Sequence, residues 1–186
     1  MNPISARELL EPVARQDYLD AMAKTAAGVT VVTSAGPEGR AGLTASSVTS
    51  VSADPPMVLV CVHHGADAHR AIAGNGAFCV NVLLPHQSPI ANVFAGYDDR
   101  YPDRFACADW TALVTGAPVL TEALAVFDCR LTQSVEASSH TVFFGVVVAV
   151  RTATGAALLY TQRDYARPVP LLSADVGGGA SGDGGL

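Results

Sequence analysis

The sequence predicts a mostly β protein whose strands form an antiparallel barrel with a few flanking helices. Five or more segments are rich in β-branched and apolar residues and are bounded by glycine or proline turns, a pattern that is typical of strands. The predicted helices are few and do not alternate with the strands as βαβ units, which argues against a parallel sheet. A length of 186 residues fits one domain, and the chain contains no internal repeat.

The first quarter of the chain predicts a helix followed by a hairpin. Residues 16–27 place apolar side chains at helical spacing, and a glycine follows them. Residues 28–35 are rich in valine and threonine and predict a strand. The Gly-Pro-Glu-Gly turn at 36–39 leads into a second strand over 41–52. The Asp-Pro-Pro sequence at 54–56 ends that strand, because proline lacks the amide hydrogen that a sheet needs.

The rest of the chain continues with strands and short helices. Strands are expected over 57–64 and 77–84, and helices over 66–76 and 88–97. The stretch 98–118 has few apolar runs and is expected to be a long excursion that holds the single tryptophan, Trp110. The last expected strands cover 123–137, 140–153 and 157–165.

These boundaries divide the chain into three parts. We expect an N-terminal extension over residues 1–15, one domain over 16–172 and a tail over 173–186. The tail is rich in glycine and has almost no side chain to bury, so we expect it to be disordered.

Composition indicates which kinds of partner and location to expect for this protein. Hydrophobic residues make up 49% of the chain and charged residues 15%, against about 25% in ordinary soluble domains. This shortage of charge predicts a surface that is buried elsewhere, most simply in a homodimer. The net charge is −6 and the basic residues are scattered, so no nucleic-acid partner is expected. No apolar run reaches the roughly 18–20 residues of a membrane span, and the N-terminal residues lack the apolar core of a signal peptide. We therefore expect a cytoplasmic protein without a membrane partner.

Cysteine and histidine spacing gives no reason to expect a metal. The cysteines are Cys61, Cys79, Cys107 and Cys129. They include no CxxC pair, and the first two lie in apolar strand segments, where a reduced cysteine is usually a small core residue. The adjacent histidines at 63 and 64 should point to opposite faces of a strand, and no third ligand stands near them in the sequence.

A hydroxyl-rich segment over residues 42–52 is the first candidate for a binding site. It carries six serine and threonine side chains in eleven residues, directly after a turn. Hydroxyls and free backbone N–H groups can bind a phosphate without a Gly-rich loop. A solvated strand rich in Ser and Thr has the same composition, so the residue types alone leave both interpretations open. Neither a Walker sequence nor a GxGxxG motif is present.

Short motifs along the chain carry a resemblance that favours the phosphate site. They are, in chain order, Asp20-Ala21-Met22, Gly28-Val29-Thr30-Val31-Val32-Thr33, Gly42-Leu43-Thr44-Ala45-Ser46-Ser47, Ser50-Val51-Ser52-Ala53-Asp54-Pro55-Pro56, Phe78-Cys79-Val80-Asn81-Val82-Leu83, Arg104-Phe105, His140-Thr141-Val142 ahead of Gly145, and Leu159-Tyr160. In this order and spacing, over roughly residues 17–167, the chain resembles the flavin reductase domain family of FMN-binding split barrels. Its motifs are most similar to the small reductase components of two-component aromatic monooxygenases.

The resemblance implies a fold and an activity. The fold is a Greek-key antiparallel barrel of six strands, with flavin bound at the interface of a homodimer. The activity is hydride transfer from NADH or NADPH to FMN or FAD, and the reduced flavin goes to a partner monooxygenase. Three alternatives remain open: a reductase of another acceptor such as a cobalt corrinoid, a flavin-dependent oxidase or oxygenase, and a non-catalytic flavin-binding protein.

The resemblance also implies which residues surround the flavin. In chain order these are Thr44, Ala45, Ser46, Ser47, Ser50, Val51, Ser52, Cys61, Val62, His63, Ala68, His69 and Phe105. The first four border the ribityl chain and phosphate, and the next three line the same groove. The strand segment 61–63 runs alongside this groove. Ala68 and His69, in the helix that follows, lie near the phosphate end of the flavin, and Phe105 covers part of the flavin ring.

Three further residues are implied at the nicotinamide side. His140 lies near the flavin and orients the nicotinamide, which makes it the candidate catalytic residue. Relatives often carry Gly-Asp before this histidine, but this chain has Ser138-Ser139. Two hydroxyls thus replace a carboxylate, so a tuned proton relay is not expected. Arg163 and Tyr165 are available for the dinucleotide or for dimer contacts, while an alanine replaces the histidine that often follows them.

Overall fold

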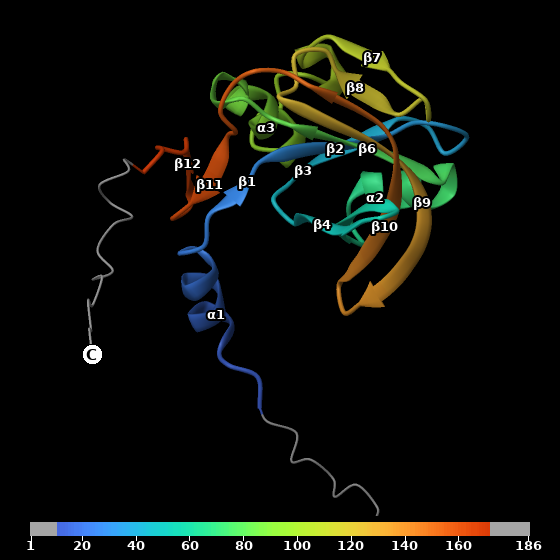
Figure 1. Ribbon diagram of the computed structural model, residues 1–186. Coiled ribbons are helices and arrows are strands. Elements are labelled where there is room, and N and C mark those ends of the chain that lie inside the picture. The colour runs from blue at the N-terminus through green and yellow to red at the C-terminus, as the bar shows by residue number, and fades with distance from the viewer. Residues whose placement is uncertain (1–10, 172–186) are drawn as a thin grey trace, which may run out of the picture.

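Strands contribute more residues to the structure than helices do (Figure 1). The computed structural model describes residues 11–171. The expected tail over 173–186 and the first ten residues of the expected extension therefore lie outside the described residues. The elements in chain order are α1 (Arg15–Met22), β1 (Ala27–Gly28), β2 (Thr30–Ser34), β3 (Ala41–Ala45), β4 (Val48–Ala53), β5 (Pro56–His63), α2 (Asp67–Asn75), β6 (Ala77–Val82), η1 (Pro85–Gln87), α3 (Ser88–Ala95), η2 (Arg104–Cys107), β7 (Trp110–Ala112), β8 (Pro118–Leu120), β9 (Ala125–Ala137), β10 (His140–Thr152), β11 (Leu159–Thr161) and β12 (Asp164–Ala166).

The main sheet is antiparallel, with the strand order β3-β2-β6-β9-β10-β5-β4. Its two outermost strands, β3 and β4, follow each other in the sequence, separated only by Ser46 and Ser47. The sheet therefore curls until its two ends meet, and β3 and β4 together act as one interrupted strand of a six-membered barrel. This confirms the predicted fold class. The expected continuous strand over 41–52 was wrong, because its first half pairs with β2 and its second half with β5.

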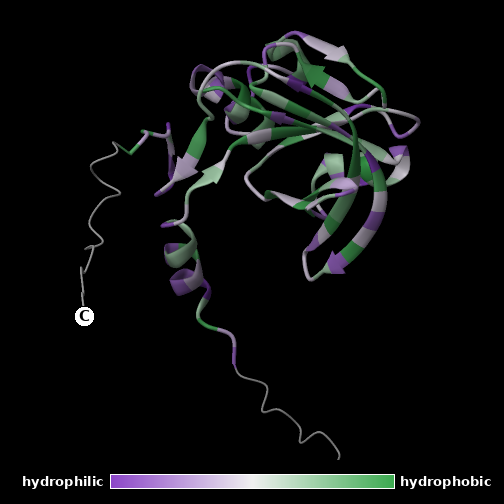
Figure 2. Ribbon diagram, in the orientation of Figure 1, coloured by the Kyte–Doolittle hydropathy of each residue, from purple (hydrophilic) through white to green (hydrophobic). Residues whose placement is uncertain are grey.

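The barrel interior is filled by alternate side chains of its strands. On β5 the inward residues Val58, Val60 and Val62 are buried, while their neighbours along the strand are partly exposed. Figure 2 shows apolar residues along the strands of the barrel, and burial alternates in the same way over the first half of β10, where Thr141, Phe143 and Gly145 are buried. Gly145 of β10 lies under the ring of Phe78: a Cβ at this position would come within 2.6 Å of the ring. Close packing against Phe78 thus explains why a glycine follows the His140-Thr141-Val142 motif.

Two of the three helices end at a glycine, within two residues of the predicted ends. α2 ends at Gly76 and α3 at Gly96, both of which have positive φ angles, of 68° and 78°. The N-terminal helix is shorter than expected. α1 ends at Met22 because the chain then turns and Ala27–Gly28 pairs with β11, so sheet pairing outweighs the helical pattern of residues 23–26.

Aromatic contacts and hydrogen bonds fix the segment over 98–118. Trp110 packs with Phe94 and Phe105, and its indole N–H donates to the carbonyl of Phe105 at 2.9 Å. Asp128 is fully buried and accepts hydrogen bonds from the backbone N–H groups of Val114 and Thr115, at 2.8 and 2.9 Å. A buried carboxylate thus organises this loop where sequence suggested little structure.

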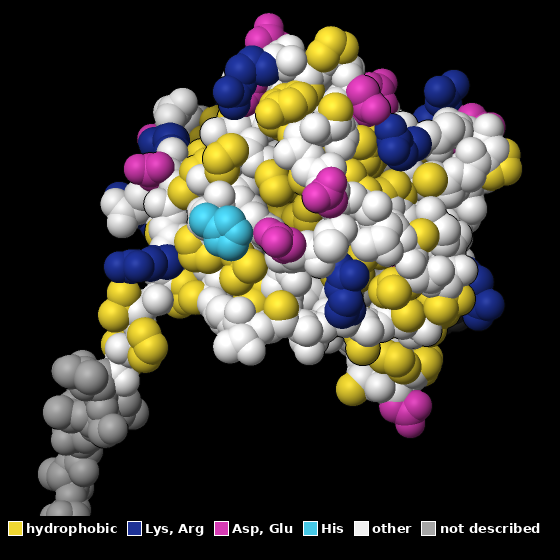
Figure 3. Space-filling model, turned by 90° about the horizontal axis from the view of Figure 1, so that it is seen from above, with side chains coloured by type: hydrophobic (Ala, Val, Ile, Leu, Met, Phe, Trp, Pro, Cys, Tyr) yellow, Lys and Arg dark blue, Asp and Glu magenta, His cyan; other side chains and the backbone are white. Residues whose placement is uncertain are grey.

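On the face shown in Figure 3, basic side chains lie apart from one another among acidic and apolar ones. Within residues 11–171, no helix has both the length and the apolar character needed to cross a membrane.

Candidate functional site

A groove of about 650 Å³ lies between α1, the turn that joins β11 to β12, and the link between β3 and β4. Its lining residues are Gln16, Leu19, Met22, Ala23, Thr25, Ala27, Ser46, Ser47, Tyr160, Thr161, Gln162 and Arg163. The volume falls within the range of about 300–1,000 Å³ that is usual for small-molecule sites. Arg163 forms an ion pair with Asp20 and so ties the β11–β12 turn to α1, which closes one wall of the groove.

The groove continues into a smaller hollow of about 170 Å³ that shares Ser46 and Tyr160 with it. The other lining residues are Val29, Thr44, Ala45, Ala95, Tyr97 and Tyr165. The phenol of Tyr165 donates to the side-chain oxygen of Asn92 at 2.8 Å, and burial raises the pKa of Tyr165. It therefore stays a neutral phenol whose position is fixed by α3.

Ser46 and Ser47 occupy the position where the barrel wall is interrupted. Both lie outside the β3 and β4 ladders, so strand pairing does not use their N–H groups. The Ser47 hydroxyl donates to the carbonyl of Cys61 at 2.9 Å, which anchors the link to β5. The Ser46 side chain is exposed, and its hydroxyl forms no hydrogen bond with any residue of the range 11–171. Free amides and a free hydroxyl at a bend are groups that suit an anion such as a phosphate.

Six of the implied site residues line these two hollows. They are Thr44, Ala45, Ser46, Ser47, Arg163 and Tyr165. The Thr44 hydroxyl already donates to the carbonyl of Ala91 at 2.7 Å, so it positions the strand. Ser50, Val51 and Ser52 do not line either hollow, because β4 turns away to pair with β5. They do not share this groove, and their contact with a bound flavin stays a prediction.

Three other implied residues are buried in the protein. Val62 and Ala68 are fully buried, and Phe105 is 7% exposed. The ring of Phe105 packs between Phe94 and Trp110, at centroid distances of 5.1 Å, and the guanidinium of Arg40 lies 4.4 Å from its centre. These side chains pack on the Phe105 ring in the chain alone, and its contact with a flavin ring stays a prediction. A side chain of Val62 or Ala68 has no access to a ligand.

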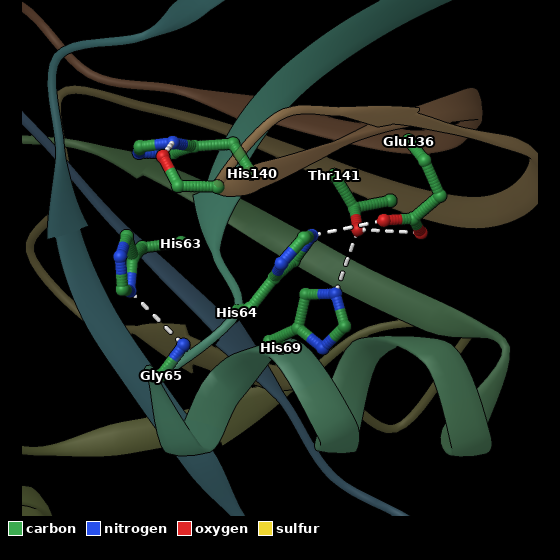
Figure 4. A network of polar contacts seen from close by, with 8 residues as sticks. His63, His64, Gly65, His69, Glu136, His140 and Thr141 are labelled. Carbon is green, nitrogen blue, oxygen red and sulfur yellow. Dashed lines mark hydrogen bonds and ion pairs between the residues drawn. The ribbon is translucent and has the colours of Figure 1, made fainter.

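His63 and His140 face each other across neighbouring strands. They are direct partners in the β5–β10 ladder, and their rings meet edge to face at 5.1 Å between centroids (Figure 4). His140 Nδ1 lies 2.9 Å from the hydroxyl of Ser139. Cys61 lies two residues before His63 on the same partly exposed face of β5, and its backbone carbonyl accepts the hydrogen bond from the Ser47 hydroxyl. One strand thus connects the Ser46–Ser47 link to the histidine pair.

A second group of side chains was missed by sequence reasoning. Nε2 of His64 lies 2.9 Å from the carboxylate of Glu136, and His69 lies next to both. His69 thus points toward the end of the β9–β10 hairpin and does not line the groove. Only the strand register brings Glu136 to His64, more than seventy residues away in the chain. No local motif could have revealed it.

Comparison with known proteins places the chain among flavin enzymes. The family model described as "Flavin reductase like domain" matches residues 22–168. The FMN reductase (NADH) RutF of Stutzerimonas stutzeri is 44% identical over 155 residues, which cover 83% of this chain and 88% of that protein.

Two solved structures show the same fold. The NADH:FAD oxidoreductase SgcE6 of Streptomyces globisporus has a TM-score of 0.78 at 33% identity, covering 88% of this chain and 98% of the other. The styrene monooxygenase flavin reductase of Pseudomonas putida has a TM-score of 0.73 at 32% identity, covering 83% and 99%.

Proposed function

Because the chain belongs to the flavin reductase family, we propose that it transfers a hydride from NADH to FMN. The RutF relative is named for both NADH and FMN and is similar over most of its length. A solved relative named for FAD shows that the fold also serves the larger flavin, so FAD is the second substrate to test.

The observation that carries this proposal is the break in the barrel wall at Ser46 and Ser47. Two N–H groups outside the strand ladders and one unpaired hydroxyl face a groove that is large enough for a mononucleotide. A flavin phosphate and ribityl chain need such donors, and the neighbouring Tyr97 and Tyr160 supply apolar surface for a ring.

A bound flavin would supply the hydride acceptor, whereas the protein supplies position. Ser46 and Ser47 hold the phosphate end. His140, paired with His63 on the outer face of the barrel, orients the nicotinamide so that its hydride faces the flavin. Positioning of this kind lowers the barrier because the reacting atoms are already aligned.

We further propose that the chain works as a homodimer. Val135, Val148 and Val150 are exposed on β9 and β10, and only 15% of all residues are charged. A second copy that packs on this face would remove apolar surface from water. α1 packs against no core, since none of its residues is buried, which also suits a position at an interface.

The partner that we propose is a flavin-dependent oxygenase. One solved relative is named as the flavin reductase of styrene monooxygenase. Supply of reduced FMN to an oxygenase would be seen as product formation by that oxygenase when this chain, NADH and FMN are all present.

The direct test is NADH consumption by the purified full chain with no flavin, with FMN and with FAD, and with NADPH in parallel. The proposal expects turnover that depends on added flavin and is faster with NADH. Tight flavin binding without turnover would instead indicate a flavin-binding protein without reductase activity.

A further inference from the structure

Three side chains that are able to bind a metal ion meet at the end of the β9–β10 hairpin (Figure 4). One ligand atom each from His64, His69 and Glu136 lies within 4.8 Å of the others. His64 is in the turn after β5, His69 in α2 and Glu136 near the end of β9. His64 and Glu136 are exposed and His69 is half-buried, so an ion in solution can reach all three.

The chemistry of this set favours a transition metal. Two imidazoles and one carboxylate form the ligand set of zinc sites that keep a fourth position for water. Imidazole nitrogen favours Zn²⁺ and Co²⁺ over Mg²⁺ and Ca²⁺, which prefer oxygen ligands. A surface His–Glu ion pair contributes little to the stability of the fold. Such a pair also needs only one histidine, so it leaves the second imidazole beside it unexplained.

A buried hydroxyl orients two of the three ligands. Thr141 is 1% exposed, and its hydroxyl donates to Glu136 Oε1 at 2.9 Å. Because that single proton points to the carboxylate, the hydroxyl accepts from His69 Nε2, which lies 2.8 Å away; an ion that binds through Nε2 releases this proton and replaces that hydrogen bond. The other carboxylate oxygen, Oε2, is left facing His64. Hydrogen bonds of this kind hold metal ligands in place and strengthen binding.

The backbone also fixes His64 relative to the hairpin. Its N–H donates to the carbonyl of Ser139 at 3.0 Å, across the tip of the hairpin from Glu136. The ligands thus come from three elements that are already joined, so little order has to be created when an ion binds.

From this convergence we propose that His64, His69 and Glu136 bind one divalent transition-metal ion per chain, of the Zn²⁺ class. The ion ties the end of the β9–β10 hairpin to α2 and to the turn after β5. This clamp includes the segment that carries Ser139 and His140. None of the three ligands lines the Ser46–Ser47 groove, so Zn²⁺ binding can be measured separately from FMN binding.

The test is metal binding by the purified full chain after treatment with a chelator. Zn²⁺ is titrated by calorimetry, and Co²⁺ is followed by its visible absorption. We expect one equivalent of Zn²⁺ per chain, a Co²⁺ spectrum that Zn²⁺ abolishes, and a melting temperature that rises with Zn²⁺. His64→Ala and Glu136→Gln should each weaken Zn²⁺ binding by at least about tenfold, and Thr141→Val by about 10- to 100-fold.

The matched control is His86→Ala, which removes an exposed histidine of η1 that does not belong to the cluster. It should bind Zn²⁺ as the wild type does. The proposal is overturned if the wild type binds no stoichiometric Zn²⁺, or if Glu136→Gln binds Zn²⁺ as tightly as the wild type. The Co²⁺ spectrum of the wild type decides the question even where a variant fails to fold, because its absence contradicts the site.

Discussion

Replacing Ser46 with alanine should weaken FMN binding more than replacing the adjacent Ser47. The Ser46 hydroxyl is exposed at the groove and unpaired within residues 11–171. The Ser47 hydroxyl already donates to the carbonyl of Cys61 at 2.9 Å, so its one proton is not free for a ligand. The two serines therefore differ in what they can offer a phosphate, although both line the groove.

The size of the effect follows from these partners. A hydrogen bond to a charged group contributes about 1.5–3 kcal/mol, so Ser46→Ala should raise the Kd for FMN by about 10- to 140-fold. Ser47→Ala removes a neutral bond to a carbonyl and should cost about 0.5–1.5 kcal/mol of folding stability. The double variant should bind FMN about as weakly as Ser46→Ala alone.

The assay is an equilibrium titration of FMN fluorescence with each variant, together with a thermal melt to confirm folding. Ser50→Ala is the matched control, since this serine is exposed on β4 but does not line the groove. Unchanged affinity in Ser46→Ala would show that this hydroxyl does not contact the phosphate, and an equal loss in Ser50→Ala would show that the phosphate does not depend on this groove.

Three further outcomes are expected. His140→Ala should raise the apparent KM for NADH with little change in FMN affinity; wild-type values of both in steady-state kinetics would leave the imidazole with a structural role only. Asp128→Ala removes a buried carboxylate that accepts hydrogen bonds from the N–H groups of Val114 and Thr115, so it should cost about 3 kcal/mol and lower the Tm by about 6–12 °C. An unchanged melting curve would contradict that account. Burial raises the pKa of Cys129 to about 12, so this thiol should resist a thiol reagent at neutral pH until the chain is unfolded. Rapid modification of Cys129 in the folded protein would show that the burial is wrong.

Local signals explain why much of the fold could be predicted from the sequence. The Gly36–Gly39 turn forms a hairpin between β2 and β3, as its residue types indicate. Gly76 and Gly96 end their helices because glycine adopts positive φ angles without strain. Each of these features depends on neighbours in the chain, so residue type and spacing were sufficient.

The break at Ser46 and Ser47 could not be predicted in this way. Thr44 and Val48 on either side of it favour a strand, and the break exists because the two halves pair with different strands. Long-range register likewise brings Glu136 to His64. Such contacts form only when the barrel closes, so no local sequence pattern predicts them.

The candidate site could likewise be predicted from the sequence only in part. The hydroxyl-rich segment was located from its residue types, and Ser46 does line the groove. Val62 could have been excluded, since it alternates with His63 and must face the interior. The burial of Phe105 could not have been foreseen, because it depends on Trp110 folding back over it.

A crystal structure of the chain with FMN would show whether the break at Ser46 and Ser47 binds the flavin phosphate. We expect the phosphate within hydrogen-bond distance of the N–H groups of Ser46 and Ser47, with the ring in the groove beside Tyr160. A phosphate held elsewhere, for example on β4 or at Arg40 beside Phe105, would contradict this expectation.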